Sequence, residues 1–516
     1  MHLSAFTTFI KQHRAECLCL LVFMAAALVG LCAHDPSFDE AQAWLIAKTA
    51  PWSDIVFSIP MDEGHPPFWH LLLAVPAKLG MGWQLVYPLL GLVCMGTGSV
   101  LILFKSPFPK WVRCLLPFSY FLFYQYGIIV RPYGLMWVIL LLLAMTFENK
   151  DKRPGVFVGW LAALCACHVY GIAIAGGIAL AWLWEIKQQC PWKDFLTDKR
   201  FHYLLGLLAF VVLITGLIFV PHNGKNLQTT YPVAWFRQLI YLLLAMPADA
   251  VLTDFHAAGH LHTVAVPWAG LLFTAFVGLL LWTLVLTALP KKRVLYLLLP
   301  YLCLVIPMTF YSSNHHIGLA LMLFVWYGWI SLPAAKLPQP LQRIAVGTLI
   351  LVLAVPTLWS AFVLWRECTL TLFPGKQIVA FLQQYNLTKR TLFVAWQTPP
   401  GAQRPSPNYQ PLGTLLNMYT RGNILANFND GKPIGYTQFV PATTPRQIQA
   451  VYNAWQAKGL PDVIIGEAPL ELVYTGHELA GQYVPTVQFK LTELWKLRRP
   501  FAIPMHVYIH QRLLGK

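Results

Sequence analysis

The chain has 516 residues, of which 57% are hydrophobic and only 11% are charged. This composition excludes an ordinary soluble domain, because most of such a chain must face lipid. The formal net charge of +16 does not indicate nucleic-acid binding, since the basic residues form short clusters between apolar stretches, where they set membrane topology and meet anionic lipid.

The first membrane span is expected at about residues 16–32. It follows Lys11 and Arg14 and lacks a small-residue cleavage site, so we interpret it as a retained anchor whose start is cytoplasmic. Ten further apolar runs are long enough to cross a bilayer, or nearly so when tilted. They lie at about residues 83–104, 114–130, 133–147, 156–170, 171–186, 201–220, 265–289, 294–311, 315–333 and 344–365.

Two other apolar stretches, at residues 66–80 and 236–246, are too short or too interrupted by Pro to be spans. We expect juxtamembrane or re-entrant segments there. The eleven-span prediction is supported by the distribution of basic residues, because alternate loops should collect them on the cytoplasmic side. The predicted cytoplasmic segments carry 17 Lys and Arg residues, whereas the predicted outer segments before residue 366 carry five.

After about residue 367 the sequence becomes mixed polar and apolar, with Pro, Asn, Gln and Thr common. We therefore divide the chain into an all-α polytopic membrane domain at 1–366 and a second, extracytoplasmic domain at 367–516, which the odd number of spans places outside. The second domain is predicted to be a small α/β fold, because helix-like and β-like runs alternate. The helix-like runs are 375–385 and 444–458, and the β-like runs are 391–396, 462–466 and 505–510.

The first outer loop, residues 34–82, is unusually acidic for so basic a protein, with Asp35, Asp39, Glu40, Asp54, Asp62 and Glu63. Ionisable groups beside membrane-adjacent apolar sequence are costly to bury and indicate function, although a solvated loop is the alternative. Within SFDEAQAW, Asp39 and Glu40 are expected at the start of a short helix. Adjacent helical positions diverge by about 100 degrees, so the two carboxylates cannot face one substrate, and one can act as a base while the other anchors structure.

Three short motifs follow one another: the Asp39-Glu40 pair after the first span, HPPFW from His65, and RPYGL from Arg131. In their order, spacing and common outer placement they resemble the type C membrane glycosyltransferases, which use polyprenyl-phosphate sugars and include protein O-mannosyltransferases and lipid A aminoarabinose transferases. The resemblance covers roughly residues 15–190 by motif and the remainder only by architecture. One departure is His65, where the lipid A enzymes tend to have Lys, which points to a different acceptor or donor phosphate contact.

The resemblance implies an inverting transfer, in which a carboxylate takes the proton of an acceptor hydroxyl as that hydroxyl attacks the anomeric carbon of a lipid-phosphate sugar. Asp39 matches the family's base, and Glu40 is the second candidate catalytic residue. A cation must stabilise the charge that develops on the leaving polyprenyl phosphate. Arg131 is the first candidate for this contact, followed by His65 and Lys225, and its alternative role is an interfacial residue that reaches lipid headgroups.

Other polar residues at predicted outer turns are candidates for lining the substrate cavity: Glu63, His168, Tyr170, His315 and His316. The alternatives are a turn between two spans capped by Gly171, and a simple polar loop for the two adjacent histidines. The HAAGHLH segment in the loop at 221–262 has an i, i+4 His pair, but it lacks the Glu of a zincin motif and contains Gly259. We therefore assign no metal ligands, and the need for a divalent cation is left open.

The sequence and the resemblance together predict a hexosyl- or pentosyltransferase, a multi-pass protein of the cell inner membrane that modifies a cell-envelope glycan or lipid. Its partners would be a polyprenyl-phosphate sugar donor, a lipid, glycan or protein acceptor, and membrane lipids, without nucleic acid. One rival is a flippase or transporter of lipid-linked sugars, which should show charges within spans and two repeated halves. Another is a non-catalytic relative. No short motif encodes the sugar or the acceptor.

Overall fold

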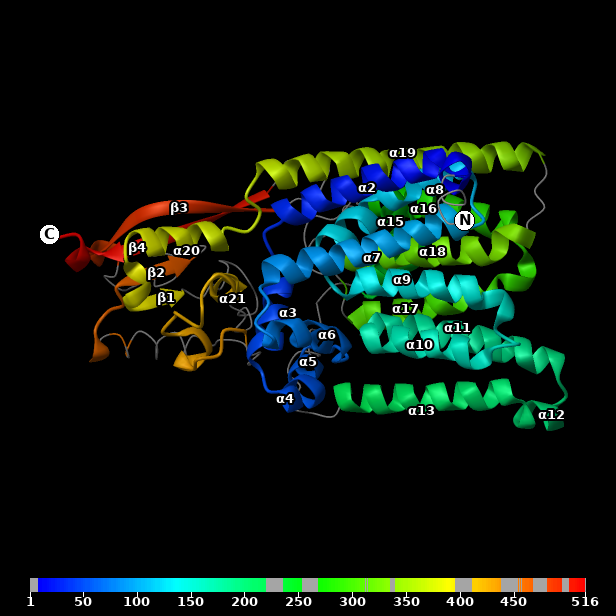
Figure 1. Ribbon diagram of the computed structural model, residues 1–516, viewed down its shortest axis with the longest axis horizontal. Helices are drawn as coiled ribbons and strands as arrows, with labels where there is room; N and C mark the ends of the chain where they lie inside the picture. Colours follow the sequence, from blue (N-terminus) through cyan, green and yellow to red (C-terminus); the bar gives the residue numbers. More distant parts are fainter. Residues whose placement is uncertain are drawn as a thin grey trace.

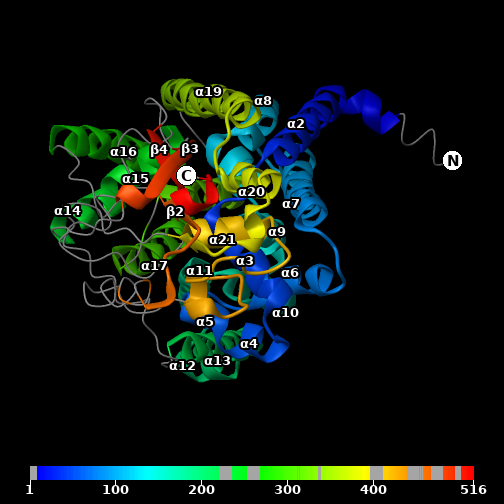
Figure 2. The same ribbon diagram turned by 90° about the vertical axis from the view of Figure 1, so that its left-hand side faces the viewer.

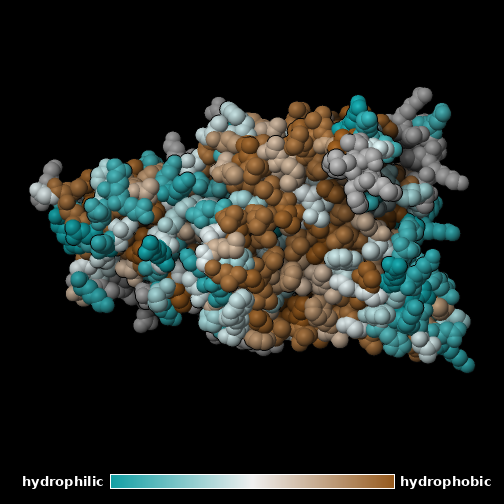
Figure 3. Space-filling view, in the orientation of Figure 1, coloured by the Kyte–Doolittle hydropathy of each residue, from teal (hydrophilic) through white to brown (hydrophobic). Residues whose placement is uncertain are grey.

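A helical bundle and a small α/β unit make up the protein, joined end to end (Figure 1). The computed structural model describes residues 8–219, 235–252, 268–310, 312, 314–334, 339–394, 411–437, 453, 455, 457–466, 480–493 and 501–515. On the face shown in Figure 3, hydrophobic residues cover most of the middle of the bundle, and hydrophilic residues gather toward both ends of the molecule. This distribution is that of a protein embedded in a bilayer.

Eight helices of the described chain are long and apolar enough to cross a membrane. Each coincides with one of the predicted spans, which confirms an α-helical membrane protein. They are built on α2 (Arg14–Ala33), α7 (Trp83–Lys105), α9 (Pro132–Thr146), α11 (Val169–Gln189), α13 (Lys199–Phe219), α16 (Trp268–Ala288), α17 (Leu295–Phe310) and α19 (Gln339–Thr369).

The other three predicted spans look different. Two of them are the 14-residue helices α10 (Pro154–Cys167) and α18 (Gly318–Ser331). A helix of that length is about 21 Å long, shorter than a hydrocarbon core of about 30 Å. The third, at 114–130, is broken into α8 (Lys110–Leu115), a 3-10 turn at Pro117 and a π-helical segment (Phe121–Ile128). The total of eleven spans therefore stays a prediction.

The segment at 66–80 contains α6 (Phe68–Lys78), which packs on α3 (Phe38–Thr49). With α4 (Trp52–Phe57) and α5 (Ile59–Asp62) these helices cover one end of the bundle, which we call the site end (Figure 1). All four come from the acidic first loop. The short helices fit the prediction of a juxtamembrane segment.

The segment at 236–246 lies in α14 (Trp235–Ile240), a π-helical stretch (Tyr241–Ala245) and α15 (Met246–Leu252), packed against α16 and α18. The π-helical turns leave carbonyls that neighbouring helices satisfy: Trp282 Nε1 donates to Leu243 O at 3.0 Å, and Tyr301 Oη donates to Leu242 O at 2.6 Å. Irregular backbone inside a membrane protein needs such partners.

The C-terminal unit has its own apolar core, which includes Ile378, Val463 and Val507. Its elements are α20 (Gly375–Gln384), β1 (Leu392–Val394), α21 (Pro411–Met418), β2 (Val463–Gly466), β3 (Tyr483–Glu493) and β4 (Phe501–His510). The sheet order is β1-β2-β4-β3, with β1 and β2 parallel and the other neighbours antiparallel. The predicted α/β character is confirmed, and the predicted helix at 444–458 lies mostly outside the described residues.

The C-terminal unit rests on the site end of the bundle. Its helix α21 packs against α3, as the two views of the molecule show (Figures 1 and 2). Leu415, Met418 and Tyr436 belong to the apolar core of the bundle rather than to that of the sheet. The first loop is therefore covered on one side by the bundle and on the other by the C-terminal unit.

Helices α11 and α17 approach each other closely at Gly177. A Cβ at this position would lie 2.3 Å from Cα of Pro300, whereas a Cβ at the adjacent Gly176 would meet nothing within 4 Å. Small residues allow such backbone approaches between membrane helices. We expect Gly177→Val to lower the free energy of unfolding by about 1–3 kcal/mol, because Pro300 backbone atoms cannot rotate away.

The measurement is the temperature at which the detergent-solubilised protein loses its monodisperse elution peak. Gly176→Val is the matched control, since it adds the same side chain one residue away in open space. Equal elution behaviour of the two variants over the whole temperature range would contradict the close packing of α11 on α17.

Candidate active site beside the first loop

At the start of helix α3, the side chain of the third helical residue, Glu40, folds back to the N-cap residue Ser37. The Glu40 carboxylate Oε2 accepts a hydrogen bond from the Ser37 backbone N–H at 2.8 Å, as in a capping box. Only 1% of Glu40 is exposed. Asp39 projects from the same helical turn in another direction, so the two neighbouring carboxylates have different surroundings, as expected from their angular separation.

Asp39 contacts Arg131. The Asp39 Oδ2 and Arg131 NH1 atoms are 3.0 Å apart, with 44% of the Asp39 side chain and 14% of the Arg131 side chain exposed. Arg131 precedes Pro132, the first residue of α9, and its guanidinium lies 5.2 Å from the ring centroid of Tyr133. The predicted base and the predicted phosphate-binding residue therefore form one ion pair with an accessible carboxylate.

A buried charged triad lies behind this pair. The His34 Nε2 atom is 2.9 Å from Glu40 Oε2, and its Nδ1 atom is 2.7 Å from Glu367 Oε1. A ring nitrogen can donate to each carboxylate only if both nitrogens are protonated, so His34 is an imidazolium. Burial opposes this charge, but Glu40 and Glu367 raise the pKa of His34 well above its ordinary value.

The same interactions hold Glu40 ionised. Burial by itself would raise the pKa of Glu40, but His34 and the hydrogen bonds from Ser37 bring this pKa below its ordinary value. The second carboxylate oxygen, Oε1, accepts the Val130 N–H at 2.7 Å, and Tyr87 Oη donates to the Glu40 carbonyl at 2.6 Å. Tyr124 Oη donates to Glu367.

Glu40 therefore connects two critical backbone positions. It directly follows Asp39 in the sequence, and its hydrogen bond to Val130 fixes the residue before Arg131. Both oxygens of Glu40 are occupied and its side chain is buried, which is the environment of the structure-anchoring member of the pair. A catalytic role for Asp39 or Glu40 stays a prediction.

Histidine and tyrosine rings extend the site from Arg131 into the bundle. Tyr133 Oη is 3.2 Å from His168 Nε2, and the His168 ring lies 4.5 Å from that of His65 between centroids. His168 Nδ1 accepts the Tyr170 N–H at 3.2 Å, so Nε2 carries the proton. His168 therefore caps α11 at the turn between two helices and also contacts Tyr133 and His65. The turn and the contact with other candidate residues are both present.

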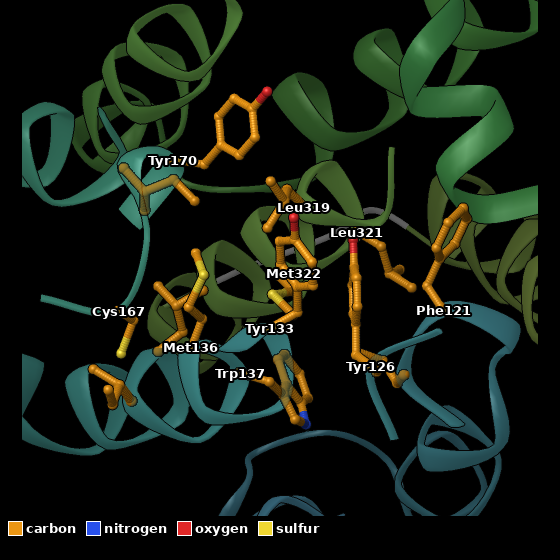
Figure 4. Close-up of a cluster of buried hydrophobic side chains, with 14 of the residues drawn as sticks. Phe121, Tyr126, Tyr133, Met136, Trp137, Cys167, Tyr170, Leu319, Leu321 and Met322 are labelled. Atoms are coloured by element: carbon orange, nitrogen blue, oxygen red, sulfur yellow. The ribbon is translucent and has the colours of Figure 1, made fainter. Parts of the chain in front are cut away.

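The chain of contacts continues to α18. Tyr170 Oη is 3.4 Å from His316 Nδ1, the rings of His315 and His316 are 4.1 Å apart between centroids, and Tyr126 Oη donates to the His315 carbonyl at 2.6 Å. Figure 4 shows Tyr126, Tyr133 and Tyr170 among the apolar side chains that surround them. All of the cavity candidates on these helices therefore belong to one network.

Glu63 meets the C-terminal unit through Gln42. The Gln42 carboxamide is buried: Oε1 accepts the Thr437 N–H, while Nε2 donates to Thr437 O and to Glu63 Oε1, each at 2.8 Å. The other Glu63 oxygen is 3.8 Å from His70 Nε2, too far for a hydrogen bond. The position of Glu63 consequently depends on residues from both ends of the chain.

The buried imidazole of His70 and the partly buried imidazole of His65 lack full hydrogen bonding. In the described part of the chain, both ring nitrogens of His70 and Nδ1 of His65 have no partner. Burial lowers the pKa of His70 to about 4. Burial, with His70 and Arg131 nearby, lowers the pKa of His65 to about 3. The lowered pKa values favour neutral rings, and a neutral imidazole can donate one hydrogen bond. A contact of His65 with the donor phosphate stays a prediction.

Other predicted residues are not placed. Lys225 and the HAAGHLH segment lie outside the described residues. Within the ranges that the structure describes, no group of three or more His, Cys, Asp or Glu side chains is arranged to hold a metal ion.

Sequence reasoning missed His34, Glu367 and Gln42. His34 and Glu367 stand at the ends of the first and last long helices, and an ionisable residue at a span end is the local signal that could have singled them out. Nothing in the neighbouring sequence indicates that these two residues pair.

Comparison of the chain with protein-family models, with curated proteins and with solved structures gives no match.

The triad predicts a dependence of stability on pH. The raised pKa of His34 means that its stabilising contribution is complete below about pH 6.5, its unfolded value, and is lost as the pH rises through the higher folded pKa. The lowered pKa of Glu40 gives a contribution that is present above about pH 4.5 and is lost as the pH falls through the folded pKa. Stability should therefore decrease on both sides of this range.

We expect His34→Gln to lower the free energy of unfolding by about 3–5 kcal/mol at pH 7, because two buried carboxylates lose their shared cation. The alkaline decrease should also disappear. The measurement is thermal unfolding in detergent between pH 5 and 10, with Glu367→Gln as a milder variant that leaves one carboxylate on His34. A pH profile of His34→Gln that superimposes on that of the wild type would contradict an imidazolium at this position.

Proposed function

We propose that this protein is an inverting glycosyltransferase that moves a sugar from a polyprenyl-phosphate donor to an acceptor hydroxyl at the outer face of the cytoplasmic membrane. The observation that carries the proposal is the contact of the accessible Asp39 carboxylate with Arg131 at one end of an apolar bundle. A base and an anion-binding group are the two parts that this transfer requires. The motifs of the first loop support the same family resemblance.

The reaction assigns one task to each side chain. Asp39 accepts the proton of the acceptor hydroxyl as its oxygen forms a bond to the anomeric carbon of the sugar. The bond from that carbon to the phosphate oxygen breaks, and its electron pair leaves with the polyprenyl phosphate. Arg131 stabilises the charge that develops there, and its planar fork suits phosphate oxygens.

Substrate binding must separate the two side chains. An inverting displacement places the incoming and leaving oxygens on opposite faces of the sugar carbon, so the base and the cation cannot stay 3.0 Å apart. An ion pair with an exposed partner contributes only about 0–1 kcal/mol. Replacement of the Asp39 contact by a donor phosphate is therefore inexpensive, while the buried triad keeps both backbone positions in place.

The sugar would occupy the space between the Asp39–Arg131 pair and the neutral histidines. A buried imidazole nitrogen without a partner destabilises the protein until a ligand or a water satisfies it. His65 and His70 provide such nitrogens, and Glu63 provides a carboxylate next to them. Neutral nitrogens and a carboxylate suit a ligand rich in hydroxyl groups, which is the chemistry of a sugar.

We expect Asp39→Asn to lower the rate of transfer by about 10²–10⁴-fold, because it removes the general base and keeps the size of the side chain. Arg131→Gln should lower it by about 10²–10³-fold. The assay follows label from a mixture of polyprenyl-phosphate sugars into membrane or periplasmic acceptors. Variants are compared at equal abundance in membranes.

Asp54→Asn is the matched control, since it removes a carboxylate of the same loop that contacts Ser53 instead of Arg131. It should transfer label at the rate of the wild type. Full activity of Asp39→Asn would eliminate Asp39 as the base. Failure of the wild type itself to transfer label from any donor in the mixture would reject the transferase and favour a flippase or a non-catalytic relative.

A further inference from the structure

A cavity of about 500 Å³ lies between α10 and the first half of α13, away from the site described above. Its apolar wall includes Val158 and Ala162 from α10 and Leu207 and Phe210 from α13. This volume is within the range of small-molecule sites, about 300–1,000 Å³. The apolar side chains of this wall suit a hydrocarbon chain.

The space is open in the middle of the groove. Gly206 lines it, and a Cβ at Gly206 would meet no atom within 4 Å. The gap between α10 and α13 is therefore not filled by side chains at this point. Room for several carbon atoms remains beside the two helices.

The other end of the groove is polar and positively charged. It is formed by Thr197, Lys199 and His202, all of which are exposed. Asp198, which precedes Lys199 in the sequence, is paired with Arg200, whose NH2 atom is 2.6 Å from Asp198 Oδ2. His202 uses Nδ1 on the Asp198 carbonyl at 2.9 Å, so its Nε2 atom points elsewhere. An anion at this end would meet Lys199 and His202, since the Asp198 carboxylate is already paired with Arg200.

We propose that this groove binds one anionic phospholipid, with an acyl chain along the α10–α13 wall and the phosphate at Lys199 and His202. Basic pockets between membrane helices recognise anionic headgroups in this way. A phospholipid is favoured over the polyprenyl-phosphate donor because of position. The far half of α13 packs through Ile214 and Ile218 on Met61 of α5 at the site end, so the polar end of the groove is at the opposite end of the helix (Figure 1).

The bound lipid would also support α13, a helix with only 22% of its apolar window buried in the protein. Helix α13 contacts α5, which immediately precedes Glu63 in the sequence. Lipid bound to α13 would therefore also stabilise α5, a part of the first loop. The proposal does not depend on the glycosyltransferase assignment, since the groove and its charges exist without it.

The experiment is native mass spectrometry of the detergent-purified protein with an equimolar mixture of phosphatidylglycerol and phosphatidylcholine of identical chains. The wild type should retain one phosphatidylglycerol with a preference of at least several-fold. Lys199→Gln combined with His202→Gln should reduce this preference to about one to one. Lys193→Gln, a basic residue at the same end that does not line the groove, is the charge control and should keep the preference.

Gly206→Leu tests the chain site, because its Cβ would meet no atom within 4 Å, its side chain would extend into the groove, and Leu has the higher helix propensity. It should abolish the retained lipid. Gly216→Leu is the matched control on the same helix, in open space outside the groove, and should bind as the wild type does. Unchanged binding by Gly206→Leu, or an unchanged preference in the charge variant, would overturn the proposal. Displacement of phosphatidylglycerol by a smaller amount of added polyprenyl monophosphate would overturn the choice of ligand.

Discussion

The buried ion triad of His34, Glu40 and Glu367 is the interaction on which the rest of this structure depends. It joins the end of the first long helix, the start of α3 and the end of α19, where the C-terminal unit begins. Buried charges are expensive, and they are tolerated only when every partner is present. Here a protonated imidazole is shared by two carboxylates, and backbone N–H groups and a tyrosine satisfy the remaining oxygens. These hydrogen bonds hold the segments around His34, Glu40 and Glu367 in a fixed arrangement.

The site follows from that placement. Glu40 is next to Asp39 in the sequence and accepts a hydrogen bond from the residue before Arg131, so one buried side chain supports both members of the Asp39–Arg131 ion pair. The different surroundings of the adjacent carboxylates result from helix geometry, because Glu40 points into the triad and the partly exposed Asp39 contacts Arg131. The C-terminal unit contributes through Gln42 and Thr437, which hold Glu63 from the side opposite the bundle. The C-terminal unit therefore helps to position a candidate site residue in addition to having its own apolar core.

Hydropathy was sufficient to locate the long helices, because a run of apolar residues is a local property. It does not reveal the break at 114–130, where the chain forms a 3-10 turn at Pro117 and a π-helical segment in place of one straight helix. Strand β3 was missed because Pro485 interrupts its pattern, and the structure accommodates this residue at a register shift. One network contains predicted site residues from several different predicted loops and turns. These residues are Asp39, His65, Arg131, His168, Tyr170, His315 and His316. The contact of His34 with Glu367 bridges 333 positions and leaves no pattern in a single sequence.

The central claim is that Asp39 and Arg131 act on opposite sides of a lipid-linked sugar. The most direct measurement is an electron cryomicroscopy structure with a polyprenyl-phosphonate sugar, in which a carbon replaces the cleaved oxygen. The account predicts phosphonate oxygens at about 2.7–2.9 Å from the Arg131 guanidinium, with the Asp39 carboxylate moved to the opposite face of the anomeric carbon. A bound sugar phosphonate located elsewhere, with the Asp39–Arg131 ion pair still closed, would contradict it.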